Sequence, residues 1–428
     1  MKKTCVYAMF LTAALCAAAF AQGGTGRDIG VGARAFAFAG NHTAAVNDLS
    51  AVYWNPAALA FLPVREFQAS FDVTRTVGTS IASGGRVSVP PGTEMDGYLD
   101  RLRLRGIGAM TAIPTVQGGL TLAASYESPF AFDDFTVYGY KYDGGAFVTE
   151  NDVRYGDLNR WNLAFGVQVA PQISAGLTVS IISGEDRTVY DDSRDGEPYN
   201  DLETKYSYLG YSLTGGFLYI PTDYLKLGLC LNMMMNLGVK QTMSVRWWEG
   251  DDWRVGNVRP DELNPVDGGA YRAPYGALGA GLTLPWLIAA FDLRLIMPYT
   301  FILPGENIPA ASQARNFKTG AGVGVEVPLP IRAPVVLRAG YSADECDFYP
   351  IVNKLEDIES IDWEAGTGYS AAGVKHALSF GTAVFTSGTG FELSYGYQMW
   401  GVKHKTKERA LEQTYSNHRV TGAIIFRY

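Results

Sequence analysis

Apolar and polar residues alternate strictly in many parts of the chain. From Trp161 to Val169 every odd position is apolar, whereas every even position is small or polar. The same period of two runs through residues 173–181, 225–233 and 391–399. Because successive side chains of a strand point to opposite faces, this pattern predicts strands that have one apolar and one polar face.

The alternation, together with turn signals, predicts about fourteen strands between residue 66 and the end of the chain. They lie near residues 66–75, 104–114, 117–127, 159–170, 173–184, 204–219, 223–240, 274–284, 286–299, 315–327, 331–342, 374–386, 389–401 and 418–427.

The connections between these strands alternate in length. Short turns are predicted at Thr115-Val116, Pro171-Gln172, Pro221-Thr222, around Pro285, at Pro328–Pro330 and at Ser387-Gly388. Long polar stretches lie between them, at residues 76–103, 128–158, 185–203, 241–273, 300–314, 343–373 and 402–417. Bacterial outer-membrane barrels have short turns at one end and long loops at the other, and a soluble sandwich has no such requirement. The alternation of short and long connections therefore favours an outer-membrane barrel.

The first residues are typical of an export signal. Lys2-Lys3 precede an apolar run from Val6 to Phe20, and Ala19-Phe20-Ala21 has the small-x-small form of a cleavage site. We therefore expect residues 1–21 to be a signal peptide that is cleaved after Ala21. A lipoprotein anchor at Cys16 is the alternative, but Leu15 stands where a small residue is expected.

Composition narrows the class further. The chain has 49 glycines, 25 tyrosines, 4 cysteines, 4 histidines and a net charge of −8. The negative charge disfavours a nucleic-acid partner, and the scarce, scattered cysteines and histidines disfavour a disulfide framework or a metal site. After the leader, no stretch has the roughly 18 consecutive apolar residues of a membrane helix. Two classes remain, a soluble β-protein and an outer-membrane barrel.

Residues 43–62 differ from the rest because their pattern is helical. Asn47 and Asp48 suit the cap of a first helical turn, and Asn55-Pro56 then stops it, since a helical conformation is disfavoured before proline. The same pair can begin a second helix, with Asn55 as its cap and Pro56 at its first position. Taken alone, this stretch is better explained as an ordinary helical hairpin of a soluble domain, and the rest of the chain reverses that judgement.

The strand pattern predicts where the helical segment lies. A sheet in hydrocarbon must close on itself, and about fourteen strands enclose more space than their own side chains fill. We therefore predict an all-β fold: a roughly 14-stranded antiparallel transmembrane β-barrel over residues 66–428, with residues 22–65 as a short helical plug, or hatch, in its lumen. The bend of the hatch is predicted at Tyr53, Trp54, Asn55, Pro56 and Ala57.

Some charged residues fall on the predicted inner face of the wall. They are Lys226, Asp292, Arg294, Arg338 and Glu392. The favoured interpretation is ion pairing between wall and hatch, with Asp28 or Asp48 as candidate partners. The alternative is that one arginine binds the carboxylate of a ligand.

The last strand ends in an aromatic residue. One face carries Val420, Gly422, Ile424, Phe426 and Tyr428, and the other carries Thr421, Ala423, Ile425 and Arg427. A terminal strand of this kind resembles the signal that the barrel-assembly machinery recognises in outer-membrane proteins. A plain last strand that happens to end in tyrosine is the alternative.

Residues 32–62 resemble the N-terminal hatch signature of the FadL family of outer-membrane transporters. The resemblance rests on the small residues around Gly32–Ala35, on Asp48–Ala51 and on Tyr53–Leu59, although Ala58 stands where the family has glycine. It implies passive uptake of long-chain fatty acids or other hydrophobic molecules across the outer membrane. It also implies that the hatch shifts when ligand binds and that ligand leaves through the wall into the membrane. The loops give no residue-by-residue match to the family.

The same hatch pattern resembles PorV-like barrels, which act as shuttles for secreted proteins in type IX secretion. The alternative function is therefore binding of exported proteins. An enzyme is disfavoured, because the chain has no Gly-x-Ser-x-Gly elbow and no persuasive histidine. We expect no cofactor. The expected partners are a hydrophobic small molecule or lipid, the lipids of the outer membrane and the assembly machinery.

Overall fold

The structure is a computed structural model. It describes residues 30–84, 94–115, 118–141, 147–194, 197–249, 252–258, 268–272, 275–296, 300–302, 318–330, 334–345, 369–372, 374–405 and 409–428. The predicted signal peptide and Asp28 lie outside the described residues.

Three short helices lie near the start of the described chain. They are α2 (Ala33–Ala37), α3 (Ala51–Trp54) and the 3-10 helix η1 (Pro56–Phe61). The break between α3 and η1 falls at the predicted Asn55-Pro56, whereas α2 was not predicted. None of the helices in the described residues is long and apolar enough to cross a membrane.

The rest of the described chain is a single antiparallel sheet of nineteen strands. Fourteen of them are long: β1 (Glu66–Gly84), β2 (Glu94–Ile113), β3 (Leu120–Ala131), β5 (Phe147–Ala170), β6 (Ile173–Arg194), β7 (Glu197–Thr222), β8 (Leu225–Glu249), β11 (Tyr275–Leu284), β12 (Leu287–Ile296), β14 (Lys318–Pro328), β15 (Val335–Glu345), β17 (Val374–Thr386), β18 (Thr389–Lys405) and β19 (Arg409–Arg427). Five are short additions: β4 (Asp134–Lys141), β9 (Asp252–Val258), β10 (Gly268–Arg272), β13 (Thr300–Ile302) and β16 (Tyr369–Ala372).

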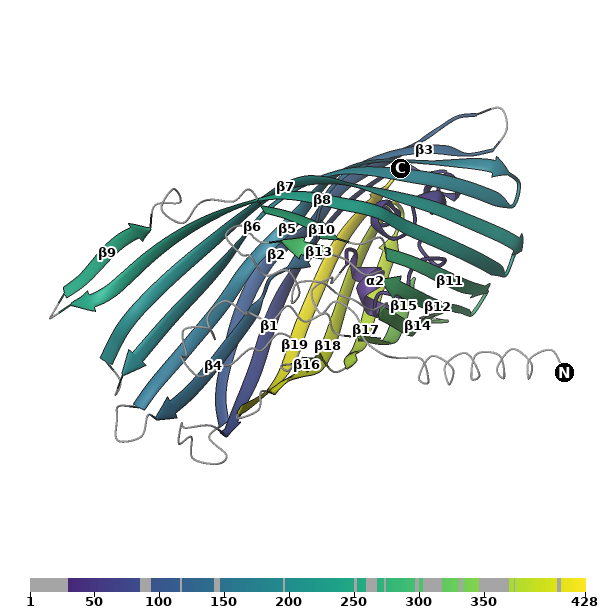
Figure 1. Ribbon diagram of the computed structural model, residues 1–428. Helices are drawn as coiled ribbons and strands as arrows, with labels where there is room; N and C mark the ends of the chain where they lie inside the picture. The colour runs from purple at the N-terminus through teal and green to yellow at the C-terminus, as the bar shows by residue number, and fades with distance from the viewer. Residues whose placement is uncertain are drawn as a thin grey trace.

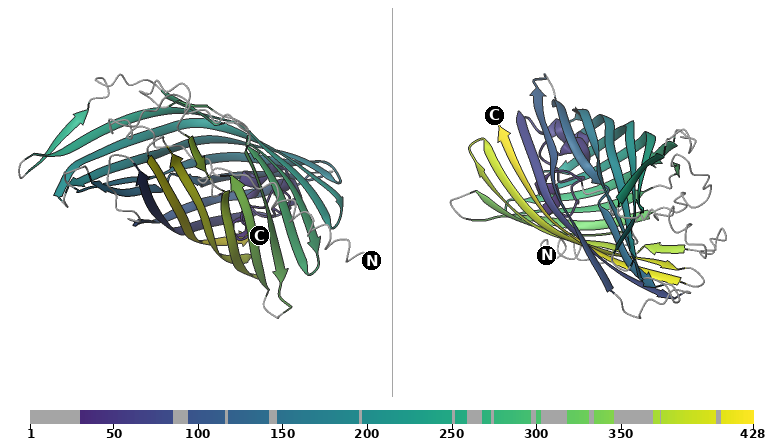
Figure 2. Two further views of the ribbon diagram at one scale, coloured as in Figure 1. Left: turned by 60° about the horizontal axis from the view of Figure 1, so that its bottom comes forward. Right: turned by 90° about the vertical axis from the view of Figure 1, so that its left-hand side faces the viewer.

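The sheet closes into a ring (Figures 1 and 2). Each long strand pairs with the long strands before and after it, and β1 pairs with both β2 and β19. The first and last strands run side by side from Glu66↔Arg427 to Gly84↔Arg409. The predicted fold class, a 14-stranded antiparallel barrel, is confirmed.

The strands are longer than predicted on the side of the long connections. β1 continues to Gly84, β6 to Arg194 and β8 to Glu249, and β9 lies wholly within a stretch that we predicted as a loop. These extensions are richer in polar and charged residues than the rest of each strand, so we assigned them to loops, although β8 keeps Met243, Val245 and Trp247 at alternate positions. Backbone hydrogen bonds to a neighbouring strand extend the ladder without an apolar face.

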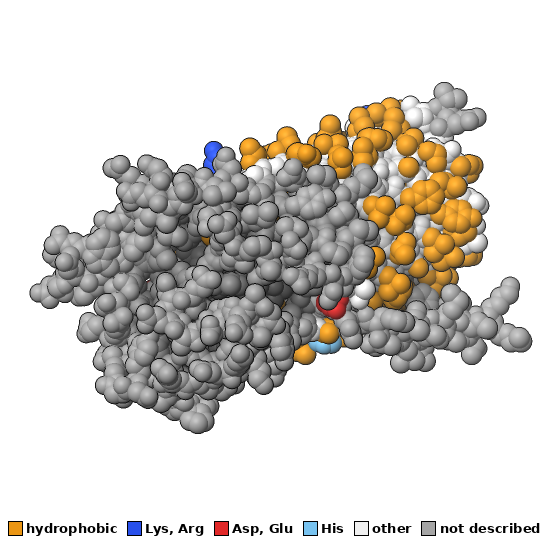
Figure 3. Space-filling model, viewed as in Figure 1, with side chains coloured by type: hydrophobic (Ala, Val, Ile, Leu, Met, Phe, Trp, Pro, Cys, Tyr) orange, Lys and Arg blue, Asp and Glu red, His pale blue; other side chains and the backbone are white. Residues whose placement is uncertain are grey.

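The outward face of the wall is apolar and the inward face is polar. Trp161 and Leu163 are 57% and 66% exposed on β5, whereas Asn162 between them is buried. Figure 3 shows apolar side chains over the described part of the outer wall. An outward apolar band is what a strand needs in hydrocarbon, so the alternation has the orientation that a membrane barrel requires.

Residues 30–65, the described part of the hatch, lie inside the ring (Figure 2, right). The helix α2 contacts β15, β17, β18 and β19, whereas η1 contacts β3, β5, β6 and β7 on another side. A segment that touches so many strands of a closed ring must be enclosed by it. Nearly all hatch residues from 30 to 60 are buried.

Wall glycines bring the hatch backbone against the strands. A Cβ atom at Gly166 would lie 2.7 Å from the Pro56 carbonyl oxygen, and one at Gly228 would lie 2.7 Å from the Thr43 carbonyl oxygen. Real Cβ atoms are not found so close, so only glycine fits at these positions. The other glycines that face the hatch are Gly119, Gly176, Gly216, Gly279, Gly281, Gly322, Gly324, Gly340, Gly381 and Gly396.

Candidate functional site

Asn55 fixes the bend of the hatch. Its side-chain oxygen accepts a hydrogen bond from the Ala57 amide (3.2 Å), which caps η1, and Pro56 follows at the first helical position. Its Nδ2 donates to the carbonyl oxygens of Thr43 (2.9 Å) and Phe217 (3.2 Å). One fully buried side chain therefore joins two parts of the hatch to β7 of the wall.

The two aromatic residues before Asn55 fill the space around it. The rings of Tyr53 and Trp54 meet edge to face at 4.9 Å, and Trp54 Nε1 donates to the Val31 carbonyl oxygen (2.9 Å). The guanidinium of Arg160, from β5, lies 5.4 Å from the centre of the Tyr53 ring. These contacts hold the start of the hatch, its bend and the wall together.

His42 is a buried histidine in the hatch with an apolar environment. Its ring lies 5.7 Å from that of Phe38 and 6.3 Å from that of Trp54, and neither ring nitrogen has a hydrogen-bond partner among the described residues. Burial holds the pKa of His42 well below its usual value, and the positive charges of Arg34 and Arg338 lower it further. The ring is therefore neutral in the docked hatch.

An alternating row of charges joins the hatch to the wall. The carboxylate of Glu326 accepts from Arg34 Nε of the hatch (2.8 Å) and from Arg338 Nε of β15 (2.7 Å). Arg338 also forms an ion pair with Glu392 of β18 (2.8 Å). All four side chains are buried, so each charge depends on its partners.

Asp292 and Arg294 on β12 hold the next part of the hatch. The Asp292 carboxylate accepts from the backbone amides of His42 (2.8 Å) and Thr43 (2.9 Å) and from the Thr43 hydroxyl (2.8 Å). Arg294 donates to the Asn41 side-chain oxygen (3.0 Å) and forms an ion pair with Asp344 (2.7 Å). Both wall residues therefore bind hatch polar groups.

The predicted charged positions face the lumen, but their partners differ from the expected ones. Asp48 accepts from the Ser50 amide (2.9 Å) instead of pairing with Arg294 or Arg338. Lys226 is half-buried on β8, opposite Gly281 of β11. A periodic pattern shows which face a residue occupies, whereas its partner depends on how the hatch is rotated within the ring.

Glu66, at the first position of β1, belongs both to the wall and to the hatch. Its carboxylate accepts from the Leu49 amide of the hatch (2.7 Å) and from Arg427 Nε at the end of β19 (2.6 Å). Next to Arg427, Phe426 and Tyr428 are 43% and 78% exposed on the outside. Their role as an assembly signal stays a prediction.

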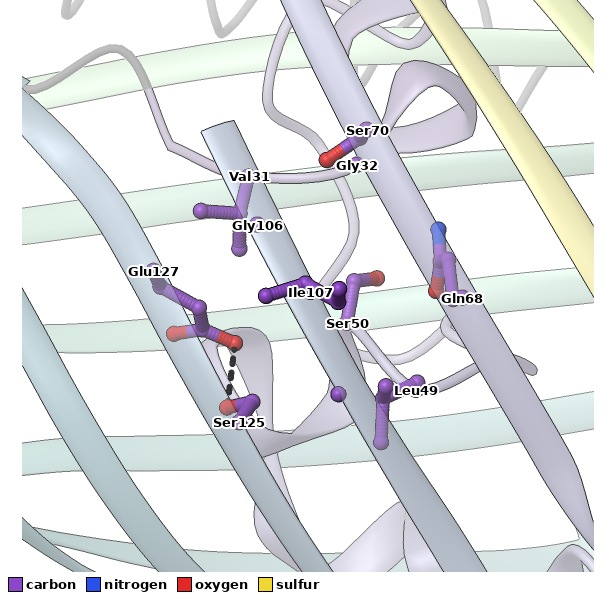
Figure 4. Close-up of a pocket in the computed structure, with 11 residues that line it drawn as sticks. Val31, Gly32, Leu49, Ser50, Gln68, Ser70, Gly106, Ile107, Ser125 and Glu127 are labelled. Atoms are coloured by element: carbon purple, nitrogen blue, oxygen red, sulfur yellow. Dashed lines mark hydrogen bonds between the residues drawn. The ribbon is translucent and has the colours of Figure 1, made fainter. Parts of the chain in front are cut away.

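A small pocket lies between the hatch and the first three strands (Figure 4). It encloses about 260 Å³ of space, part of which is open to solvent. The hatch contributes Val31, Gly32, Leu49 and Ser50, and the wall contributes Gln68, Ser70, Gly106, Ile107, Gly108, Ser125 and Glu127. Only the thickness of β2 separates this pocket from the outer surface, where Ile107 is 39% exposed.

The ladder between β2 and β3 ends beside this pocket. It runs from Ile113↔Leu120 to Gly106↔Glu127, and residues 94–105 of β2 continue only along β1 in the described ladders. A bulge between Glu127 and Phe130 turns β3 away at this point, and β4 pairs with β5. The wall is therefore not continuously hydrogen-bonded next to the pocket.

Proteins of known structure share this architecture. A FadL homologue from Pseudomonas aeruginosa is 12% identical, with a TM-score of 0.58 over 93% of this chain and 98% of that chain. The toluene transporter TodX of P. putida is 15% identical, with a TM-score of 0.60 over 94% and 99%. The toluene transporter TbuX of Ralstonia pickettii is 13% identical, with a TM-score of 0.52 over 93% and 99%.

The chain has a FadL-type fold. The sequence itself matches no protein-family model and no curated protein. At such low identity the likeness concerns the fold and not the residues that line it.

Within this FadL-type fold lies a buried charge cluster that sequence reasoning missed. The Asp72 carboxylate of β1 lies 2.5 Å from both Arg105 Nε and Arg419 Nε. Arg105 also donates to the Ser128 carbonyl oxygen (2.6 Å), where the β3 bulge begins. Asp72 is in phase with the inward positions Ser70 and Thr74, so the alternation of β1 contained a signal for it.

A second pair of contacts holds the connection between β3 and β4. Arg103 forms ion pairs with Asp133 and, at 2.6 Å, with Asp157. The chain just before Asp133 packs into an aromatic and aliphatic cluster inside the FadL-type barrel. Its members are Phe130, Phe132, Leu158, Ile182, Tyr206 and Tyr208. The described residues hold no group of three or more side chains that could bind a metal ion.

Proposed function

We propose that this protein is an outer-membrane transporter for the passive uptake of hydrophobic small molecules. The observation that carries the proposal is the end of the β2–β3 ladder beside a pocket that borders both the hatch and the outer wall. A molecule in this pocket is next to the membrane without having crossed the whole lumen. The FadL-type fold supports the proposal, because TodX and TbuX are toluene transporters.

The driving force of such transport is the transfer of apolar surface out of water. An apolar solute gains roughly 25 cal/mol for each Å² of surface that leaves water, so entry into the lumen and then into the membrane needs no energy source. Val31 and Leu49 of the hatch border the pocket, so a shift of the hatch would widen it.

The substrate belongs to the hydrophobic compounds, and long-chain fatty acids and monoaromatic hydrocarbons are the two candidate classes. The hatch, residues 22–65, is proposed as the gate, with its bend at Tyr53–Ala57. In this proposal Asp292 and Arg294 anchor the hatch directly, and Arg338 and Glu392 anchor it through Glu326 and Arg34. Lys226 is the fifth luminal charge. No observation on the described residues favours the alternative of a type IX secretion shuttle.

The test is an analysis of what the purified protein binds, together with uptake by cells. We expect organic extracts of the pure protein to contain a hydrophobic molecule in near-equal amount, as identified by mass spectrometry. Cells that express the protein should accumulate labelled toluene or oleate faster than cells with the empty vector. Extracts without such a molecule, combined with unchanged uptake, would exclude the transport function. Co-purification of secreted proteins would support the shuttle instead.

A further inference from the structure

The lining of the pocket between the hatch and strands β1–β3 includes a buried carboxyl group. Glu127 of β3 is 3% exposed in the protein, and its carboxyl group borders this pocket (Figure 4). The apolar part of the lining comes from Val31, Leu49 and Ile107. No lysine or arginine is among the residues that line it.

The hydrogen bonds behind Glu127 all point towards it. Ser180 Oγ donates to the Asn162 side-chain oxygen (2.6 Å), and Asn162 Nδ2 donates to both Ser125 Oγ (3.0 Å) and Glu127 Oε2 (2.8 Å). The Ser125 hydroxyl, which already accepts from Asn162, donates to Glu127 Oε1 (3.1 Å). Every donor in this series of hydrogen bonds is thereby used, and Glu127 is the acceptor at its end.

The other fixed hydroxyl of the pocket is also committed. Ser50 donates its hydroxyl hydrogen to the Asp48 carboxylate, so only the lone pairs of its oxygen remain for a ligand. Arg160 is the ladder partner of Glu127, but its guanidinium lies over the Tyr53 ring and is not part of the lining. Glu127 and Ser50 therefore offer acceptors to whatever enters the pocket, and Gln68 and Ser70 complete the polar part of its lining.

We propose that this pocket binds the polar end of an uncharged hydrophobic molecule that carries a hydrogen-bond donor, such as a phenol or an alcohol. Glu127 is the residue that determines this specificity. It accepts the donor, and it disfavours carboxylate anions because two negative charges in a water-poor site repel each other. This inference rests on the proposed transport function and names its substrate class.

The size of the pocket agrees with a small group. Only about 20 Å³ of it can be reached by the centre of a water-sized sphere, which is room for about one water molecule. A hydroxyl group fits, with the apolar body of the molecule lying towards the end of the β2–β3 ladder. Fatty acids would enter this position poorly, because their polar end is an anion.

The test compares two probes that share one apolar body, 4-butylphenol and 4-butylbenzoate. Titration calorimetry on the full-length protein in detergent, at about pH 8, keeps the phenol neutral, since phenols ionise near pH 10. We expect the phenol to bind at least about tenfold more tightly, a difference of about 1.4 kcal/mol. In Glu127→Gln this preference should fall below about threefold, mainly through tighter binding of the benzoate. Equal affinities in the wild type, or an unchanged preference in Glu127→Gln, would overturn the inference.

Two further variants keep the result interpretable. Glu185→Gln makes the same change at a carboxylate that is 50% exposed on β6 and should leave the preference unchanged. In Gly106→Ala the new Cβ would lie 3.4 Å from Ser70 Oγ, an ordinary contact, so the protein should fold. Because that methyl group occupies the pocket, we expect about tenfold weaker binding of the phenol. Unchanged binding would place the probe elsewhere and refute the site.

The proposed function is tested separately with butylbenzene, which has the same apolar body and no polar end. Faster uptake of butylbenzene by expressing cells, with a phenol preference that Glu127→Gln does not alter, would reject only this inference. Uptake equal to that of vector cells would reject the transport function. Heat-dependent migration of each variant in gels verifies that its barrel is folded.

Discussion

Asn55→Asp tests how strongly the hatch is held, because it replaces only the side-chain NH2 group at the bend of the hatch by an oxygen. The aspartate keeps the oxygen that caps η1, but it loses the Nδ2 that donates to Thr43 and Phe217. Two carbonyl oxygens would then face a carboxylate in a buried place. Each buried group without a partner costs about 1–3 kcal/mol, so we expect docking of the hatch to weaken by roughly 3 kcal/mol.

Hydrogen–deuterium exchange measures this loss directly. A loss of roughly 3 kcal/mol raises the undocked population by about a hundredfold, since 1.4 kcal/mol corresponds to a factor of ten. Amides of residues 43–61 should therefore exchange about a hundredfold faster in the purified variant, while the amides of β5 to β8 stay protected.

A matched control is Asn417→Asp, which removes a hydrogen bond to Thr76 (2.8 Å) within the wall. This change should leave the exchange of the hatch as it is in the wild type. Wild-type exchange of residues 43–61 in Asn55→Asp would refute the anchoring role of Asn55. Equally increased exchange in hatch and barrel would show that the residue stabilises the whole protein.

The remaining predictions concern the hatch and its charges. Deletion of residues 22–65 should turn the protein into a leaky pore in planar bilayers, and background conductance would show that the hatch does not plug it. Gly228→Val should also raise conductance, because even a Cβ there would lie 2.7 Å from the Thr43 carbonyl oxygen. Acid should loosen the hatch: the pKa of His42 is lowered by burial, so the undocked state binds more protons below about pH 6.5. The contribution of His42 to docking then weakens by up to about 1.4 kcal/mol per pH unit, and His42→Phe should remove this contribution in exchange measurements. Arg338→Ala should cost about 3–5 kcal/mol in urea unfolding, and folded protein with normal uptake would exclude a ligand role for Arg338.

The sequence predicted the wall well because lipid imposes a strict rule on it. Every outward position must be apolar over the membrane, so the alternation persists through each strand and marks its limits. The predicted strand 374–386 coincides with β17, and 173–184 begins where β6 begins. Beyond the apolar band the rule no longer applies, so we assigned most strand extensions to loops, although β8 keeps alternate apolar residues as far as Trp247.

The interior was predicted less completely, since its contacts join residues far apart in the chain. Arg34 and Glu326 are 292 positions apart, and nothing local to either residue indicates the other. Arg105 faces inward together with Gly106 because of a bulge opposite Ser70, and a bulge interrupts the period on which the prediction rests. Glu127 falls at the edge of predicted strand 117–127, where inward residues could not be ranked.

Glu66 links the closing of the cylinder to the filling of its interior. Its carboxylate is shared between Arg427, at the junction of the first and last strands, and the Leu49 amide. A cylinder sealed around an empty centre would lack one of these partners, and a seated N-terminal segment without the seal would lack the other. Closure of the barrel and docking of the hatch thus favour each other thermodynamically. We therefore expect the hatch to be in place as soon as the barrel closes during biogenesis.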